Sequence, residues 1–317
     1  MSVDVSVVIV SYHCRDEVLA CLASIAEGAA STAVEVIVLD NDSGDGTVEA
    51  ITERFPDVRV LPEPVNLGFA RGVNRAAEHA QGEFLLLLNP DTVVHEGAID
   101  NLVAFARAHP EHGLYGGRTL DPDGTPHPAS CWGAPTLWSL TCFATMLSTV
   151  FKRSPVFDPE SLGHWQRDTV REVDIITGCL LLVRSALWRE LGGFDARYFM
   201  YGEDVDLALR ARSLGYRPAI TPDAVITHEI GVSSESRPEK FRLVLQGKVT
   251  VIDQHWSPAR RRLGRALLTA GVGTRALAAA VTRRGATQGS GAGAATWRQL
   301  WRERSTWLAG FPAHQDR

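Results

Sequence analysis

The stretch Phe84-Leu85-Leu86-Leu87-Leu88-Asn89-Pro90-Asp91 decides the fold class, because a wholly apolar run ends directly in polar residues. Five large apolar residues in a row are typical of a strand buried on both faces of a parallel sheet. Val3 to Val10 and Val34 to Leu39 have the same character. Residues that follow such strands lie at the mouth of the crevice where open α/β sheets bind ligands. We therefore expect Asp91 at a binding site.

Helical patterns alternate with the strand patterns over the first half of the chain. This alternation predicts right-handed βαβ units and a doubly wound α/β sheet, mostly parallel, with helices on both faces. The other elements that we expect are helices at Asp16 to Ala26, Val48 to Phe55, Ala70 to Ala80, Ser185 to Leu191 and Asp204 to Ser213, and strands at Val58 to Leu61 and Arg171 to Arg184.

Charge divides the 317 residues into an acidic body and a basic tail. Residues 1–236 carry 17 Lys and Arg against 33 Asp and Glu, whereas residues 237–317 carry 15 against 4. We expect one large domain over residues 1–235 and a basic helical extension over residues 236–317. The acidic body argues against nucleic acid as a partner, and the basic tail suits an anionic surface.

Cysteine usage and the N-terminus indicate the compartment. The five cysteines are odd in number and show no C-x-x-C spacing, so neither a disulfide framework nor a zinc site is expected. Residues 1–11 lack the basic segment and cleavage site of a signal peptide and are better interpreted as a strand. A cytoplasmic protein fits both observations.

Gly124 to Phe151 breaks the alternation of strands and helices. It contains no Asp, Glu, Lys or Arg, yet it carries Trp132 and Trp138. Its content of Pro, Ser and Thr argues against a membrane span. We interpret it either as a partly buried helix and loop over the active site, or as a lid that contacts the acceptor or the membrane.

The tail has a helical face that carries Trp297, Leu300, Trp301 and Leu308 beside many arginines. Trp and Arg together on an amphipathic helix suit the bilayer interface. The alternative is a helix that packs on the body or on a second subunit of a homo-oligomer.

Asp40-Asn41-Asp42-Ser43-Gly44-Asp45-Gly46 follows the second strand directly. A calcium loop is excluded, because no starting position restores the spacing of such loops. The segment is either a polar turn that caps the next helix or an acceptor for the ring N–H of a nucleobase. A Rossmann dehydrogenase is disfavoured, since Ser11-Tyr12-His13 offers none of the glycines that its first turn requires.

Asp91 itself has two interpretations. It could cap the helix that follows, as Asp often does. Its position after a buried strand favours a metal, because Mg²⁺ takes one or two protein carboxylates and completes its octahedron with water and phosphate.

Several motifs, in order and with compatible spacing, together resemble the family 2 glycosyltransferases, in particular the rhamnosyltransferase-like branch. They are Val7-Val8-Ile9-Val10-Ser11-Tyr12, Asp40-Asn41-Asp42-Ser43, Asn66-Leu67-Gly68-Phe69-Ala70-Arg71-Gly72-Val73-Asn74, Leu88-Asn89-Pro90-Asp91-Thr92, Gly192-Gly193-Phe194-Asp195 and Gly202-Glu203-Asp204-Val205-Asp206. The resemblance covers about residues 3–235. It implies a GT-A fold, with a nucleotide-binding half at about 1–118 and an acceptor-binding half at about 119–235.

The resemblance also implies inverting transfer from a nucleotide sugar and assigns residues to the donor site. The nucleotide would be held by Ser11, Tyr12, Asp40, Asn41, Arg71 and Asn89. Asp91 would bind Mg²⁺ or Mn²⁺. Asn89 replaces the first Asp of the family's D-x-D motif, which removes one anionic contact, and His228 matches the position of a further metal ligand.

For the acceptor side, the resemblance implies that Asp204 is the general base and that Glu203 orients sugar hydroxyls. The alternative is a pair of acids that stabilise a helix N-terminus. Gly178 matches a small residue that lets a sugar approach the backbone. We also assign Trp132 to substrate binding, because acceptor choice is expected in the region around it.

The main hypothesis is a metal-dependent inverting glycosyltransferase that moves L-rhamnose from dTDP-rhamnose to a cell-envelope glycan on a polyprenyl-diphosphate carrier. The enzyme would sit peripherally on the inner face of the membrane through its tail. UDP-galactofuranose or another UDP-hexose is the alternative donor. A non-catalytic sugar-nucleotide-binding protein is the alternative from another class. A nucleotidyltransferase is disfavoured, since no Gly-rich basic loop follows the first strand.

Overall fold

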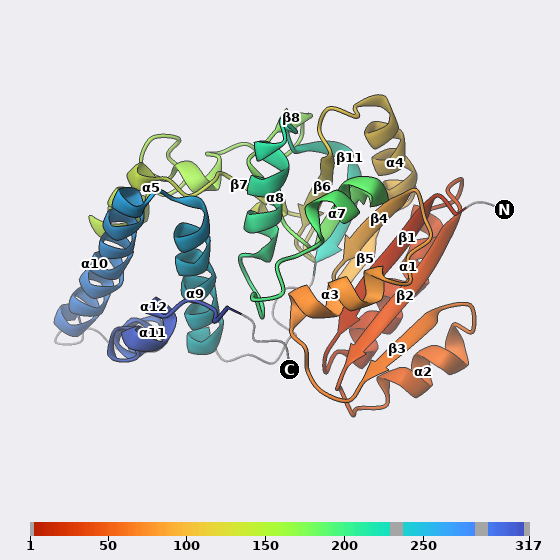
Figure 1. Ribbon diagram of the computed structural model, residues 1–317, viewed down its shortest axis with the longest axis horizontal. Helices are drawn as coiled ribbons and strands as arrows, with labels where there is room; N and C mark the ends of the chain where they lie inside the picture. The colour runs from red at the N-terminus through yellow and green to blue at the C-terminus, as the bar shows by residue number, and fades with distance from the viewer. Residues whose placement is uncertain (1–2, 229–236, 283–290, 314–317) are drawn as a thin grey trace. The chain divides into compact units, whose positions relative to one another are not determined.

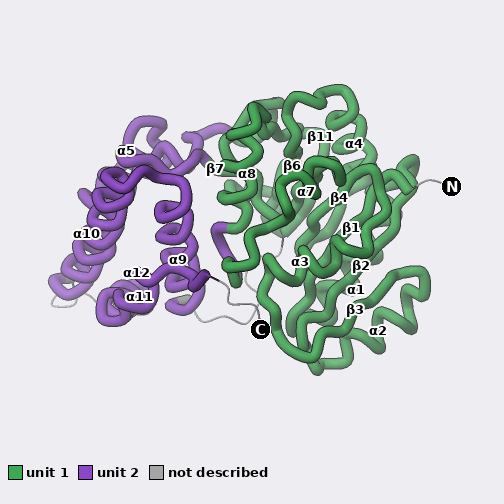
Figure 2. The backbone as a smooth tube through the Cα atoms, in the orientation of Figure 1, with its two compact units in different colours: residues 1–132, 166–199, 203–234 green, residues 133–165, 200–202, 235–317 purple. Residues whose placement is uncertain are grey.

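The computed structural model describes residues 3–228, 237–282 and 291–313. The chain forms two compact units (Figure 2). The first takes its residues from 1–132, 166–199 and 203–234, and the second from 133–165, 200–202 and 235–317. Residues 133–165, which the sequence placed in the acceptor-binding half, therefore pack with the C-terminal helices.

Four parallel strands form one half of the main sheet of the first unit, in the order β3-β2-β1-β4. They are β1 (Val5–Ser11), β2 (Val34–Asn41), β3 (Arg59–Glu63) and β4 (Phe84–Leu88). Every residue of β1 and β4 is buried, as their apolar runs predicted. Ser11 pairs in register with Asp40, so the polar ends of β1 and β2 meet at one edge of the sheet.

The other half of the main sheet is mixed. The order continues β4-β10-β6-β11-β5, and a short strand β8 also pairs with β11. These strands are β5 (Thr92–Val94), β6 (Leu114–Leu120), β8 (Arg171–Glu172), β10 (Leu180–Arg184) and β11 (Ala219–His228). Strand β10 runs antiparallel to both β4 and β6.

The prediction of a single strand at Arg171 to Arg184 is wrong, because this segment contributes short strands to two different sheets. Its first piece is β8 and its last is β10, both in the main sheet. Its middle piece, β9 (Ile175–Ile176), pairs instead with β7 (Cys131–Trp132) in a separate two-stranded sheet. Asp174 lies between β8 and β9, and Thr177-Gly178 lies between β9 and β10.

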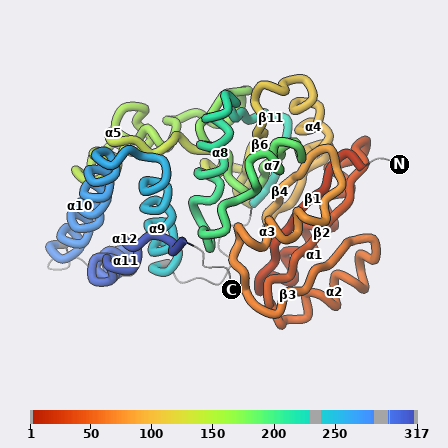
Figure 3. The backbone as a smooth tube through the Cα atoms, viewed as in Figure 1, coloured from red at the N-terminus to blue at the C-terminus, as the bar shows by residue number. Residues whose placement is uncertain are grey.

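Helices cover both faces of the sheet (Figure 1). On one face, α1 (Arg15–Gly28), α2 (Thr47–Arg54) and α4 (Ala98–Ala108) share a core with alternate residues of β1 and β4. On the other face lie α3 (Phe69–Ala77), which contacts β1 and β2, and α7 (Ser185–Leu191), which contacts β4 and β10. Figure 3 shows the green segment with α7 and the orange segment with α3 in this layer, so distant parts of the chain build it. The doubly wound arrangement is confirmed.

The second unit is helical. Its helices are α5 (Leu137–Ala144), α6 (Leu147–Val150), α9 (Arg237–His255), α10 (Pro258–Thr282), α11 (Gly291–Arg302) and α12 (Arg304–Leu308). A capping box between Thr136 and Ser139 begins α5, which packs on α10. None of the described helices combines the length and the apolar character that crossing a bilayer requires.

The helical face predicted to meet a bilayer is largely used inside this unit. Leu300 is fully buried in a core with Leu140, Leu245 and Val272, and Trp297 and Leu308 pack against the same core. Trp301 remains partly exposed. Most of this face is therefore buried among the helices of its own unit, where an apolar stripe is stabilised by packing. Docking on the first unit or on a second subunit stays a prediction.

Candidate active site

The first cluster of predicted residues lies where β1 and β2 end. The Ser11 hydroxyl donates to Asp40 Oδ1 at 3.1 Å, and the Ser43 N–H donates to Asp40 Oδ2 at 3.1 Å. Asp40 is only 4% exposed. Its carboxylate thus has a donor on each oxygen, which holds the turn after β2 in place and leaves the remaining lone pairs of the oxygens for a ligand.

Asn41 organises the loop that leads into α3. Its Oδ1 accepts the N–H of Leu67 at 2.7 Å, and its Nδ2 donates to Asn66 Oδ1 at 2.9 Å. The Phe69 N–H, at the start of α3, donates to Phe199 O at 2.7 Å. Asn41 is 2% exposed, so what the structure shows of this side chain is loop support, and its predicted contact with a nucleotide stays a prediction.

Tyr12 and Arg71 lie nearer to solvent. Tyr12 is 39% exposed, and its ring centre is 4.2 Å from that of His13. An exposed aromatic ring at the end of a central strand can stack on a base. Arg71 Nε donates to Ala196 O at 3.0 Å, which ties α3 to the segment that follows α7.

The second cluster lies at the end of β4 and contains Asn89, Asp91 and His228. His228 is the last residue of β11 and pairs with Thr92 of β5. This pairing brings His228 Nε2 to 2.9 Å from Asp91 Oδ1 and to 3.4 Å from Asn89 Nδ2. The three predicted residues therefore converge, although His228 is 137 positions away from Asp91 along the chain.

The donor set in this second cluster fits a divalent cation. Two ligands on adjacent positions of an octahedral ion with bonds of about 2.1 Å stand about 3.0 Å apart. The separation of Asp91 Oδ1 and His228 Nε2 is 2.9 Å. His228 is 9% exposed, and its Nδ1 is buried without a hydrogen-bond partner among the described residues. Imidazole with carboxylate suits Mn²⁺ at least as well as Mg²⁺.

The third cluster comes to the same sheet edge through the antiparallel pairing of β4 with β10. The Asn89 N–H donates to Cys179 O at 3.2 Å, one step beyond the pair Leu88 and Leu180. Gly178, the preceding residue, offers its backbone N–H to the Asp204 carboxylate. A Cβ at Gly178 would meet the Phe69 ring at 3.1 Å, which explains the small residue here.

The pKa of the Cys179 thiol is affected by the carboxylates of Asp204 and Asp91. Burial raises the pKa of its thiol to about 11, and the negative charges of Asp204 and Asp91 act in the same direction. The backbone on either side of this residue gives the direct link: Gly178 N–H reaches Asp204, and Cys179 O accepts the N–H of Asn89.

Glu203 and Asp204 begin α8 (Glu203–Ser213), where Glu203 is buried and Asp204 is half-buried. Burial raises the pKa of Asp204 to about 6, although the Val205 and Gly178 N–H groups oppose the shift. Burial, together with the charge of Asp204, holds the pKa of Glu203 well above its usual range. Glu203 Oε2 has no hydrogen-bond partner among the described residues. The helix dipole would favour acids at this position whether exposed or partly buried, but a buried acid with a raised pKa and no hydrogen-bond partner for Oε2 among the described residues favours a chemical role.

Trp132 lies in β7, paired with Ile175 of β9. Thr177 stands between β9 and Gly178, and its N–H donates to Ser130 O at 3.1 Å. Trp132 thus belongs to the two-stranded sheet that leads into the third cluster. Its contact with a substrate stays a prediction.

Cys179 and Asn66 were missed as individual site residues by sequence reasoning. Asn66 stood inside a quoted motif, and its Oδ1 also accepts the N–H of Gly68 at 2.8 Å. Cys179 follows Gly178 directly, but only the pairing of β10 with β4 reveals its place beside Asn89. No local pattern would have identified it.

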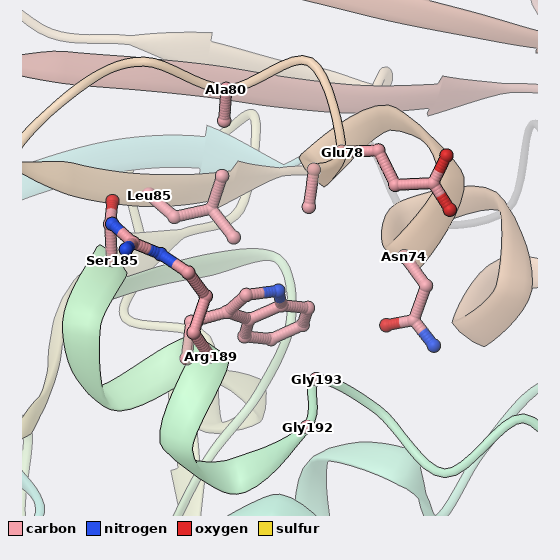
Figure 4. Close-up of a pocket in the computed structure, with 10 residues that line it drawn as sticks. Asn74, Glu78, Ala80, Leu85, Ser185, Arg189, Gly192 and Gly193 are labelled. Carbon is pink, nitrogen blue, oxygen red and sulfur yellow. The ribbon is translucent and has the colours of Figure 1, made fainter.

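Two other features lie away from this edge. A cavity of about 440 Å³ is lined by Asn74, Leu85, Ser185 and Arg189 among others (Figure 4). Leu85 is at the start of β4, so the cavity is near the opposite end of the strand from Asn89. His109, Glu111 and His112 offer ligand atoms within 4.8 Å of one another, in the turn before β6. Neither feature contributes to the three clusters.

Comparisons with known proteins identify the family. The sequence model of Glycosyl transferase family 2 matches residues 6–187. The N-acetylglucosaminyl-diphospho-decaprenol L-rhamnosyltransferase of Mycobacterium tuberculosis is 34% identical over 239 residues, covering 70% of this chain and 76% of that protein. The rhamnosyltransferase WbbL of Escherichia coli is 33% identical over 147 residues, covering 45% of this chain and 51% of that protein.

Solved structures agree on the fold. The mannosyltransferase PcManGT from Pyrobaculum calidifontis, in complex with GDP-Man and Mn²⁺, has a TM-score of 0.54 at 20% identity, covering 98% of this chain and 86% of that one. GalNAc-T7 with UDP, GalNAc and Mn²⁺ has a TM-score of 0.57 at 15% identity, covering 80% and 48%. At these identities the likeness shows the fold alone, which is GT-A. With a family model that spans more than half of the chain and a curated relative that shares a third of the aligned residues, the protein belongs to glycosyl transferase family 2 as a rhamnosyltransferase-like member.

Proposed function

We propose that this glycosyltransferase moves L-rhamnose from dTDP-rhamnose to a polyprenyl-diphosphate-linked glycan of the cell envelope, with inversion at the anomeric carbon. The observation that carries the proposal is the link between the two clusters at one sheet edge: Asp91 and His228 lie beside Asn89, and Asn89 bonds to Cys179 next to Gly178, whose N–H reaches Asp204. The mycobacterial relative, which by its name transfers L-rhamnose to a decaprenol-linked sugar, supports the choice of donor and acceptor.

Asp204 is the proposed general base. A base must be able to hold a proton near the working pH, and a pKa of about 6 satisfies this condition. It would accept the proton of the acceptor hydroxyl as that oxygen attacks the anomeric carbon from the face opposite the diphosphate. A single displacement of this kind inverts the configuration.

Glu203 is the proposed orienting residue. Its buried carboxyl has a raised pKa, so its protonated form can donate a hydrogen bond to a sugar oxygen while Asp204 accepts a proton. The unpartnered Oε2 leaves that bond available within the described part of the chain.

The donor site is proposed at the ends of β1, β2 and β4. Tyr12 would stack on the base, Asp40 would accept its ring N–H, and Arg71 would lie near the diphosphate. Asp91 and His228 would hold a divalent cation, with Asn89 beside it. When bound, Mg²⁺ or Mn²⁺ supplies a Lewis acid that neutralises charge on the departing diphosphate.

A donor panel tests the proposal. The purified protein, with Mn²⁺ or Mg²⁺ and a prenyl-diphosphate-linked acceptor, would be given dTDP-rhamnose, UDP-galactofuranose and UDP-hexoses in turn. We expect nucleoside diphosphate release and a new glycosidic bond with dTDP-rhamnose, and NMR of the product should show the inverted anomer. Preference for a UDP-sugar would show that the donor is not dTDP-rhamnose. Sugar-nucleotide binding without any transfer would favour the non-catalytic alternative.

Peripheral attachment at the inner face of the membrane through the basic extension is also proposed. The charge of residues 237–317 supports it, whereas the burial of Leu300 removes much of the apolar face first assigned to it. Because α5 packs on α10, the test keeps the full-length protein and replaces exposed cations of the extension, as in Arg260→Gln/Arg262→Gln, before flotation with anionic vesicles. A variant that floats as well as the wild type would show that these cations do not anchor the protein.

A further inference from the structure

An apolar cluster on the second unit faces solvent. We define it as Trp138, Val150, Phe151, Val156 and Phe157. Trp138, Val150, Phe151 and Val156 are 48%, 70%, 47% and 54% exposed. Single exposed apolar residues are ordinary, but a contiguous group marks a contact surface.

The members of the apolar cluster hold one another in place. Trp138 Nε1 donates to Val156 O at 2.6 Å, which fixes the loop after α6 against the start of α5. The Phe157 ring lies 6.3 Å from the Trp138 ring and 5.0 Å from the Phe151 ring, between centroids. The surface is therefore preformed.

The charged residues next to the apolar cluster in the sequence are mostly cationic. Gly124 to Phe151 carries no charged residue, and the exposed Lys152 and Arg153 follow it at once. Of the next two acids, Asp158 keeps its charge and accepts the backbone N–H of Arg153 at 2.9 Å, whereas Glu160 is paired with Lys248 at 2.7 Å. Aromatic side chains bordered by cations match the interface of an anionic bilayer.

We propose that the apolar cluster inserts into the interfacial layer of an anionic phospholipid bilayer, with Lys152 and Arg153 against the lipid phosphates. This inference rests on the proposed function in one respect: a lipid-linked acceptor would explain why the enzyme binds a bilayer. The chemistry of the surface itself comes from the five side chains and the two cations.

The test is flotation of the full-length protein with phosphatidylcholine vesicles, with and without phosphatidylglycerol. The variant Val150→Glu/Val156→Glu changes two side chains that are more than half exposed, so folding should be little affected. We expect wild-type protein to bind the anionic vesicles and the variant to bind at least about tenfold more weakly, because two carboxylates oppose both insertion and the anionic surface.

The matched control is Val170→Glu/Leu214→Glu, whose side chains are 53% and 51% exposed and belong to the first unit. It adds the same charge and should retain wild-type binding. A third variant, Lys152→Gln/Arg153→Gln, should bind more weakly and with a smaller dependence on salt.

Several outcomes would overturn the inference: no binding of wild-type protein to anionic vesicles, equal binding by wild type and Val150→Glu/Val156→Glu, or equal losses in that variant and its control. A wild-type dimer in sedimentation that Val150→Glu/Val156→Glu dissociates would assign the surface to a second copy instead. Flotation needs neither donor nor acceptor. It therefore tests membrane binding even if the donor panel rules out transfer of rhamnose.

Discussion

The two acidic clusters of the site differ in what surrounds their carboxylates. Asp91 has the imidazole Nε2 of His228 2.9 Å from its Oδ1, and the same nitrogen is 3.4 Å from Asn89 Nδ2. Glu203 is buried beside the half-buried Asp204, and its Oε2 has no partner among the described residues. A carboxylate among ligand atoms is suited to a cation, whereas one that burial leaves reluctant to ionise is suited to a proton. The neighbours of each carboxylate, and not its residue type, therefore separate the two proposed roles.

The largest effect should come from Asp204→Asn. Transfer should fall by about 10²- to 10⁴-fold in kcat, because the amide cannot accept the proton of the acceptor hydroxyl. Donor affinity, measured by calorimetry with Mn²⁺ present, should be unchanged. A variant that keeps most of its turnover would remove Asp204 from the chemistry.

Asp91→Asn tests the other carboxylate of the comparison, the one proposed to bind the metal. We expect the affinity for a nucleotide sugar to fall by about 10- to 100-fold when Mn²⁺ is present, since an anionic ligand is lost. Affinity in the presence of a chelator should be the same for variant and wild type. If calorimetry shows equal metal-dependent affinities, Asp91 is not a metal ligand.

The pH dependence of kcat/KM tests the role of Asp204 in the pair that it forms with Glu203. Only the ionised form of Asp204 can act as a base, and its pKa is about 6. Below that pH, kcat/KM should therefore fall by about tenfold per unit, and above it the profile should level off. A profile that stays flat from about pH 5 to about pH 8 would contradict the assignment.

The smallest effect concerns stability, and it distinguishes Asp204 from Asp206 on the same helix. Folding raises the pKa of Asp204 from 3.8 to about 6, so its ionisation destabilises the fold as pH rises through that window. Asp204→Asn should raise the free energy of unfolding by about 1 to 2 kcal/mol above pH 6 and have little effect near pH 4.

Asp206→Asn is the matched control for the stability prediction. Asp206 is buried and pairs with Arg210 at 2.7 Å, so its removal should lower the free energy of unfolding by at least about 1 kcal/mol at neutral pH. Thermal denaturation of both variants at about pH 4 and about pH 8 measures the difference. Shifts of the same sign at the higher pH would show that the two acids share one environment.

The amino-acid sequence by itself determined the local elements and the residue types of the site. The apolar run predicted β4 at Phe84–Leu88, and the pattern closed by two glycines predicted α7 at Ser185–Leu191, both with the bounds that the structure has. These features depend on neighbours a few positions away, so periodicity and capping are sufficient to find them. The motifs likewise included Asp91 and Asp204, and the family resemblance added His228.

Only the tertiary structure decided which of these residues meet. The antiparallel insertion of β10 beside β4 brings Cys179 to Asn89, and the pairing of β11 with β5 brings His228 to Asp91. The burial that raises the pKa of Asp204, and the packing that hides Leu300, also arise from partners far along the chain. Strand pairing and burial are set by the free energy of the whole fold, which no local pattern contains.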